Sequence, residues 1–327
     1  MKRNTFYGSS KANIKDKYGL TPRDYYKMLS DGVWCAETCA PRMRKDWTPG
    51  NKTLGQCSVT AFIMQDLFGG KVLGVPLEGG GFHCFNDVSG CVFDLTNEQF
   101  VGRLPDYKAA VEQSREVHFA KEEKYKRYLL LKEKLFEKLP RIIETPRLVL
   151  RPFTHNDAAD VEDYLGNIDV NCFLSMKISG RKEALKAARR RASSRDYYFA
   201  IADRETGKVA GEIFGEPEAE DPELKTADTV SVCWMLGKGY RGKGYAYEAA
   251  RAYVDYLFNE KGMRRVYAYT EDTNVSSRRL CERLGMRQEG LFREFISFVK
   301  NPDGTPHYEN TYQYAVLRKE WDKCRLS

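Results

Sequence analysis

The stretch Arg241-Gly242-Lys243-Gly244-Tyr245-Ala246 lies between a predicted strand and a predicted helix. Apolar residues alternate over 230–236 before it and recur with helical spacing over 246–258 after it. Because Gly242 and Gly244 lack Cβ atoms, backbone N–H groups can approach an anion closely. The new helix directs its unpaired amides and positive dipole end to the same point. The turn therefore predicts a cradle that suits a pyrophosphate.

The sequence that follows the turn supports this interpretation. An Arg-x-x-Gly-x-Ala pattern alone begins an ordinary helix more often than it binds a cofactor. Here, however, a further strand is predicted over 265–270, and a second helix begins at 274–277 (Asn-Val-Ser-Ser) and ends at 284–286 (Leu-Gly-Met). The order of strand, glycine turn, helix, strand and helix favours a cofactor site.

The region from 145–153 (Thr-Pro-Arg-Leu-Val-Leu-Arg-Pro-Phe) to 317–321 (Leu-Arg-Lys-Glu-Trp) resembles the GCN5-related N-acetyltransferases, or GNAT family, and within them the branch that acetylates ribosomal-protein N-termini. The opening and closing motifs, the glycine turn, Asn-x-x-Ser and Leu-Gly-Met followed by Glu-Gly stand in the family's order. The resemblance covers slightly more than half of the chain. It implies a GNAT fold over 143–327, with a mixed, mostly antiparallel sheet flanked by helices, and acetyl-CoA as co-substrate.

The resemblance also implies which residues bind acetyl-CoA. The turn amides would hold the pyrophosphate, and the strand that ends at Leu236 would splay from the next strand and pair with the pantetheine arm. Asn274 would hydrogen-bond the pantetheine amides, and Ser277, one helical turn later, would approach the sulfur. The implied cofactor-binding residues are Met235, Leu236, Arg241, Gly242, Lys243, Gly244, Tyr245, Ala246, Asn274 and Ser277.

Two positions depart from common family patterns. Ser231 stands where many members carry a Glu, and Cys281 stands where many carry a Tyr general acid. The remaining catalytic candidates are Ser277, for protonation of the leaving thiolate, and Glu294 or Glu289 as general base. A solvent-facing position explains Glu294 equally well. Water could instead take the amine proton while the enzyme holds both substrates together. We interpret Cys281 as a small residue of the hydrophobic core.

The first half of the chain places Cys57, His83 and Asp94 in an order typical of thiol enzymes. Cys57 begins a predicted helix that Gly69 ends, and the other two lie on predicted short strands. A helix N-terminus favours a thiolate, a facing His can take its proton, and an Asp can orient the imidazole. Cys57 would be the nucleophile, His83 the general base and Asp94 its orienter. Gln56 is a candidate oxyanion donor. A buried, inert cysteine remains an alternative.

This half resembles small bacterial proteins of the YunG type, through motifs at 55–61 (Gly-Gln-Cys-Ser-Val-Thr-Ala), 65–70 (Gln-Asp-Leu-Phe-Gly-Gly) and 94–100 (Asp-Leu-Thr-Asn-Glu-Gln-Phe). We expect a small α+β domain over 1–111, with a Cys-His-Asp order similar to that of papain and transglutaminase. Zinc ligation by cysteines and His83 is disfavoured, because the chain has no Cys-x-x-Cys pair. We expect no metal.

The length and composition of the chain bear on its domain number, its localisation and the state of its cysteines. A chain of 327 residues is long enough for two domains. Residues 112–139 have the pattern of one long amphipathic helix, which would lie within a connector over 112–142. Alternatively, this helix packs within one of the two domains. No apolar run approaches a membrane span, and no signal peptide is evident, so we expect a cytoplasmic protein. The number of cysteines, nine, is odd, which favours reduced thiols over a disulfide framework. The run 189–191 (Arg-Arg-Arg) could contact a ribosomal surface, although a solvated helix face is the simpler interpretation.

The leading hypothesis is an acetyl-CoA-dependent N-acetyltransferase that acts on a primary amine, either a protein N-terminus or a small molecule, by direct attack in a ternary complex. A net charge of +7, spread over residues of both signs, gives no reason to expect a nucleic-acid or membrane partner. The alternative is a cysteine hydrolase or amide-transfer enzyme at Cys57, with the second half as a coenzyme-binding sensor. A non-catalytic binding protein is the third class.

Overall fold

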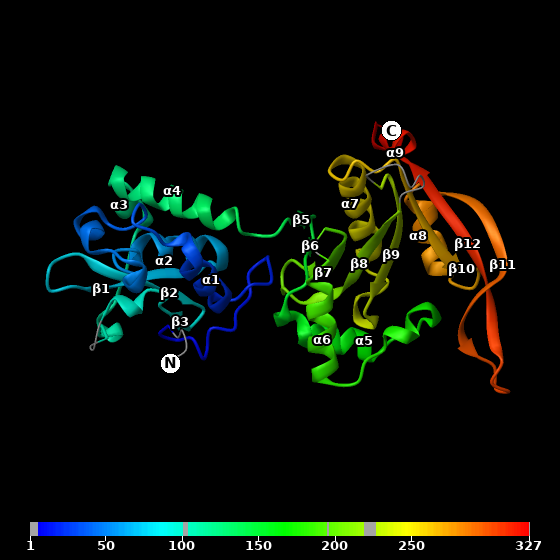
Figure 1. The fold of residues 1–327 in the computed structure, drawn as a ribbon, viewed down its shortest axis with the longest axis horizontal. Helices are drawn as coiled ribbons and strands as arrows, with labels where there is room; N and C mark the ends of the chain where they lie inside the picture. Colours follow the sequence, from blue (N-terminus) through cyan, green and yellow to red (C-terminus); the bar gives the residue numbers. More distant parts are fainter. Residues whose placement is uncertain (1–5, 101–103, 195, 219–226, 327) are drawn as a thin grey trace. The chain divides into compact units, whose positions relative to one another are not determined.

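The computed structural model describes residues 6–100, 104–194, 196–218 and 227–326. The chain divides into two compact units, Met1–Leu139 and Pro140–Ser327 (Figure 1). Each unit has its own sheet, helices and hydrophobic core. The chain is therefore a two-part α+β protein, as the sequence predicts.

The first unit is built on an antiparallel four-stranded sheet in the order β3-β2-β1-β4. Its strands are β1 (Lys71–Pro76), β2 (Phe82–Val88), β3 (Cys91–Phe93) and β4 (Val111–Glu112). Its helices are α1 (Pro22–Met28), α2 (Cys57–Phe68), α3 (Arg115–Phe119) and α4 (Glu122–Phe136). Helix α2 is buried from Ser58 to Met64 and packs against β2.

The structure differs from the prediction of one long connecting helix over 112–139. The segment begins in β4 and then forms two helices, α3 and α4, because the chain leaves helical geometry at Lys121 (ψ 101°). Tyr128, Leu131 and Leu135 on α4 are buried in the core of the first unit. The amphipathic face of α4 therefore packs within the first unit, which is the alternative that the sequence left open.

The second unit is built on an eight-stranded mixed sheet in the order β11-β12-β10-β9-β8-β7-β6-β5. Its strands are β5 (Ile143–Glu144), β6 (Leu148–Arg151), β7 (Tyr198–Asp203), β8 (Val209–Glu218), β9 (Thr229–Leu236), β10 (Arg265–Glu271), β11 (Arg287–Lys300) and β12 (Pro306–Leu317). Its helices are α5 (Ala158–Gly166), α6 (Arg181–Arg191), α7 (Tyr245–Asn259), α8 (Val275–Arg283) and α9 (Arg318–Leu326).

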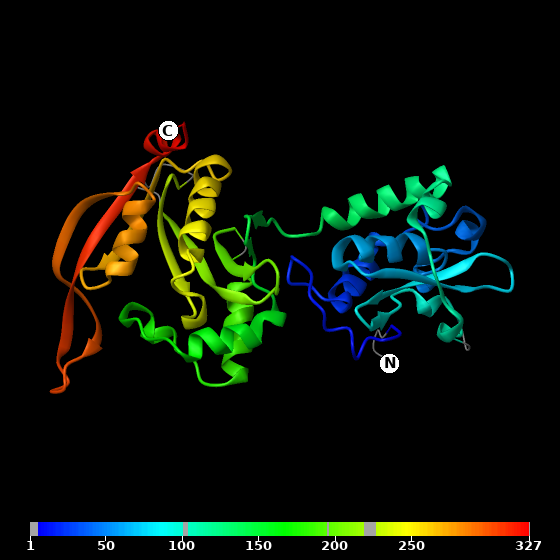
Figure 2. The same ribbon diagram turned by 180° about the vertical axis from the view of Figure 1, so that it is seen from behind.

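Helices cover both faces of this sheet. On β7, Phe199 and Ile201 join the core that includes α7 and α8, whereas Ala200 between them joins the core that includes α5 and α6. Because side chains alternate across a strand, the two helix pairs lie on opposite faces. Helices α5 and α6 lie side by side in both views (Figure 2).

One pair of neighbouring strands, β9 and β10, runs parallel and separates along its length. The two strands pair only at Thr229, Val230 and Ser231 of β9. Beyond Ser231, β9 continues to Leu236 in register with β8 alone. The sheet therefore opens between β9 and β10, and α7 forms the crossover that joins them.

A buried ion pair fixes α6 to the sheet. Arg191 and Glu212 are both buried, and the guanidinium donates to the carboxylate from Nε at 2.5 Å and from Nη2 at 3.0 Å. The hydroxyls of Tyr164 and Tyr198 donate to the same carboxylate, at 2.7 and 2.9 Å. Arg191 is thus unavailable to a ribosomal surface, whereas Arg189 and Arg190 are exposed.

We expect Glu212→Gln to lower the free energy of unfolding of the second unit by about 3–5 kcal/mol, because it leaves a buried guanidinium without its counter-charge. Arg190→Gln on the exposed face of the same helix is the matched control and should change stability by less than about 0.5 kcal/mol. Urea unfolding of both variants beside the parent chain measures the difference. Equal losses for the two variants would contradict the role assigned to the ion pair.

Candidate functional site

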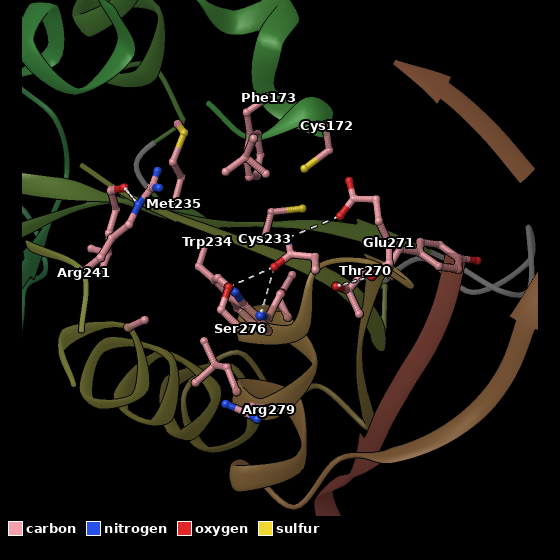
Figure 3. A pocket seen from close by; sticks show the side chains of 18 of the residues that line it. Cys172, Phe173, Cys233, Trp234, Met235, Arg241, Thr270, Glu271, Ser276 and Arg279 are labelled. Atoms are coloured by element: carbon pink, nitrogen blue, oxygen red, sulfur yellow. Dashed lines mark hydrogen bonds between the residues drawn. The ribbon is translucent and has the colours of Figure 1, made fainter. Parts of the chain in front are cut away.

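The opening between β9 and β10 is the main cavity among the described residues, with a volume of about 820 Å³. It extends to the N-terminal ends of α7 and α8 and to the segment around Phe173 (Figure 3). Its lining includes Val232, Cys233, Trp234, Met235, Leu236, Arg241, Gly242, Gly244, Tyr245, Ala246, Tyr269, Thr270, Glu271, Asn274, Ser276, Ser277 and Arg279. Most of the cofactor-binding residues predicted from the sequence therefore line one cavity, and Lys243 stands beside it in the turn.

The glycine turn has a backbone conformation that favours glycine at two positions. Gly242 and Gly244 have φ values of 75° and 80°, in the left-handed region that residues with a Cβ rarely adopt. Gly244 is the N-cap of α7, so the helix begins at Tyr245 with its first amides at the cavity. Arg147 stabilises the turn by donating from Nη1 to the Lys243 carbonyl at 2.9 Å.

The side chain of Arg241 has a structural role in the turn. Its Nε donates to the Leu236 carbonyl at 3.1 Å, and its Nη2 donates to Asp169 at 2.8 Å. This hydrogen bond to Arg241 holds the pKa of Asp169 below its ordinary value. Arg241 thus joins the end of β9 to the turn, and an anion at the turn would be held mainly by backbone amides.

Asn274 and Ser277 lie together at the start of α8. Asn274 is the N-cap, and its Oδ1 accepts from the Ser277 N–H at 3.2 Å and from Ser276 Oγ at 3.0 Å. Its Nδ2 lies 3.4 Å from Glu271 Oε2. The Asn-x-x-Ser motif therefore caps the helix and also presents a hydroxyl, that of Ser277, to the cavity.

An acidic group that sequence reasoning missed lies in the cavity. Glu271, the last residue of β10, is only 7% exposed. The sulfur atoms of Cys172 and Cys233 point toward its carboxylate (Figure 3). Burial, followed by the hydrogen bond to Glu271, raises the pKa of Cys172, and burial raises the pKa of Cys233 to about 12. Both thiols therefore stay protonated near neutral pH. The sequence signal for Glu271 was its place three residues before Asn274.

The structure places the other predicted residues elsewhere. Glu294 is exposed at a bulge of β11 and does not line the cavity. Glu289 is held by Arg265 and Arg287, each at 2.5 Å. Cys281 is buried in the core, as expected, and burial raises its pKa to about 12. Ser231 is the last β9 residue that pairs with β10.

The first unit brings Cys57, His83 and Asp94 together. His83 Nε2 lies 2.6 Å from Asp94 Oδ2, and its Nδ1 lies 3.2 Å from Gln99 Nε2. His83 also helps to lower the pKa of the Cys57 thiol. Gln56 does not fit the predicted role of oxyanion donor, because its Nε2 donates to the Cys35 carbonyl at 2.9 Å. The local sequence gave no sign of this contact, since Cys35 lies 21 residues away.

Among the described residues, no helix is sufficiently long and apolar to cross a membrane. No group of three or more His, Cys, Asp and Glu side chains in that part of the chain is placed to hold a metal ion.

Comparison with known proteins gives each unit a family. Residues 21–140 match the model of the YunG protein family, and residues 147–287 match the acetyltransferase (GNAT) domain model. The uncharacterised N-acetyltransferase YnaD of Bacillus subtilis is 28% identical over 185 residues, which cover 55% of this chain and 99% of YnaD. The uncharacterised protein YunG of the same organism is 37% identical over 81 residues, which cover 24% of this chain and 68% of YunG.

Among solved structures, the ribosomal-protein-S5-alanine acetyltransferase of Vibrio fischeri is 16% identical, with a TM-score of 0.44 over 55% of this chain and 98% of that chain. Both resemblances drawn from the sequence are confirmed by the family matches. The chain belongs to the YunG family through its first part and carries, in its second part, a GNAT-family N-acetyltransferase domain.

Proposed function

We propose that this protein transfers an acetyl group from acetyl-CoA to a primary amine at the cavity between β9 and β10. The observation that carries the proposal is the coincidence of two features: strands that separate after Ser231, and a glycine turn that opens α7 at the same cavity. The family uses acetyl-CoA, and the residues present fit that molecule.

The fit rests on shape and backbone groups. No atom lies within 4 Å of the position that a Cβ would take at Gly242, so this part of the turn is open to a ligand. The first amides of α7 are suited to the pyrophosphate. The edge of β9 from Val232 to Leu236, which does not pair with β10, offers backbone groups to the pantetheine amides. Met235 and Leu236 lie at the end of this edge.

The cavity residues support direct acetyl transfer. Acetyl-CoA supplies an activated acetyl carbon as a thioester. Glu271 takes a proton from the attacking ammonium, directly or through water, and so produces the neutral amine. A backbone N–H on the free edge of β9 stabilises the oxyanion. The Ser277 hydroxyl, at the start of α8, passes a proton to the leaving thiolate and regains one from water. Glu271 thus takes the role of base for which the sequence suggested Glu294.

The acceptor is a primary amine that enters as a cation. Glu216 and Glu271 both line the cavity, and their carboxylates attract a positive charge. Phe173, Tyr269 and Phe295 provide apolar surface around these acids. This chemistry suits a protein N-terminus or a small molecule, which remain the two classes to be compared by screening.

We expect Gly244→Val to weaken coenzyme A binding at least tenfold. A residue with a Cβ costs about 1–2 kcal/mol in the left-handed conformation, so the turn would leave the geometry that directs its amides at the pyrophosphate. Gly239→Ala is the matched control, since this nearby glycine lies outside the left-handed region and its Cβ would meet open space. Titration calorimetry compares the dissociation constants. Unchanged binding by the Gly244 variant would contradict the phosphate cradle.

We expect Glu271→Gln to lower kcat about 100-fold on any amine that turns over, because a positioned base contributes at least that factor. The dissociation constant for acetyl-CoA should stay within about twofold, since the amide keeps the shape of the side chain. The exposed Glu294→Gln is the control and should retain parent activity. Release of free coenzyme A thiol, measured with a panel of amines, gives the rates. A larger loss in the Glu294 variant than in the Glu271 variant would reverse the assignment.

A further inference from the structure

The first unit holds a second cluster of reactive groups that acetyl transfer does not use. Cys57 is the first residue of the twelve-residue helix α2, and its side chain is half-buried. His83 lies on β2, and Asp94 pairs with Tyr7 in a β-bridge just after β3. These three elements bring a thiol, an imidazole and a carboxylate together from positions far apart in the sequence.

The carboxylate is fixed in place on both of its oxygens. Asp94 Oδ1 accepts from the Thr96 N–H at 2.9 Å and from Thr96 Oγ1 at 3.0 Å. Its Oδ2 accepts from the Tyr107 hydroxyl at 2.8 Å and lies 2.6 Å from His83 Nε2. His83 and Asp94 are both fully buried, so the imidazole is held in one orientation. Such a contact orients the ring and favours its charged form.

The surroundings favour a charged thiolate and imidazolium. A hydrogen bond from Cys84 and, against the effect of burial, the hydrogen bond and charge of His83 lower the pKa of Cys57 well below its ordinary value. Burial alone would lower the pKa of His83, but Asp94 and Cys57 together raise it to about 10. His118 on α3 and Lys124 on α4 also interact electrostatically with the Cys57 thiol.

Cys84 remains a thiol beside this pair. Its hydrogen bond to Cys57, together with burial, raises its pKa well above the ordinary value. Burial, reinforced by Lys124, lowers the pKa of His118 to about 4, so that ring is neutral at physiological pH. Of these two thiols, Cys57 is the one whose pKa is lowered, and its partly exposed side chain leaves it accessible to a reagent.

We propose that Cys57, His83 and Asp94 form a second catalytic site, which cleaves an amide bond through a thioester on Cys57. The Cys57 sulfur bonds to the carbonyl carbon, the C–N bond breaks, and the His83 imidazolium gives its proton to the departing amine. His83 then takes a proton from water, whose oxygen displaces the sulfur. The products are an amine and a carboxylic acid, and the thiol is restored with no oxidant or reductant. Asp94 is a positioning residue that orients His83.

The first test is alkylation of the full chain with iodoacetamide, followed residue by residue with mass spectrometry. Because the thiolate is the nucleophile, Cys57 should react at a nearly constant rate between about pH 6 and pH 8. Cys91 is the internal control: it is half-buried on β3, and burial raises its pKa, so its rate should rise about tenfold per pH unit in this range. Equal pH dependence for the two cysteines would overturn the proposal without any mutation.

The second test is acylation by p-nitrophenyl acetate. We expect a burst of p-nitrophenolate equal to the protein concentration, with the acetyl group mapped to Cys57. Cys57→Ala should abolish the burst, His83→Gln should slow it at least about 100-fold, and Cys91→Ala should retain it. Circular dichroism checks that each variant is folded. A burst that survives in the Cys57 variant, or an acetyl group mapped to another residue, would overturn the proposal.

Discussion

The second unit depends on the separation of two parallel strands. Strands β9 and β10 pair at three positions and then part, because β10 continues in register with β12 while β9 continues with β8. Parallel strands require a crossover, and α7 provides it, so its N-terminus lies where the strands open. The same geometry leaves backbone groups free on β9. One constraint thus places a hydrogen-bonding edge, a helix N-terminus and the buried Glu271 around one cavity.

The features that could be predicted from sequence are those that local chemistry dictates. Gly242 and Gly244 indicate a turn whose backbone amides can approach an anion, because they lack Cβ atoms, and in the structure both have positive φ in the turn that precedes α7. Glu271 was missed because only the separation of β9 from β10 turns its strand end into a cavity wall. The sequence suggested Gln56 as an oxyanion donor, because it does not reveal the long-range hydrogen bond from Gln56 to the Cys35 carbonyl. A run of charged residues can also mislead about exposure, because Arg191 follows two exposed arginines but is itself buried against Glu212.

The two units contain cysteine thiols whose pKa values are shifted in opposite directions. In the acetyl-transfer cavity, Cys172 and Cys233 lie near carboxylates, and burial keeps them protonated. In the first unit, His83 and Cys84 stabilise the Cys57 thiolate at the start of α2. Neighbouring hydrogen-bond donors and charges decide which state is favoured, since burial alone disfavours the thiolate in both places. The two proposals therefore assign a distinct acyl chemistry to each unit: an amine attacks a thioester in the second unit, and a thiolate attacks an amide in the first.

Calorimetric titration of the full chain with acetyl-CoA tests the central claim most directly, because it examines the cavity before any acceptor is known. The account predicts binding of one equivalent with a micromolar dissociation constant, and competition by coenzyme A, since the pyrophosphate and pantetheine contacts are shared by both molecules. The absence of binding by either molecule would contradict the claim that the opening between β9 and β10, with the glycine turn of α7, is an acetyl-CoA site.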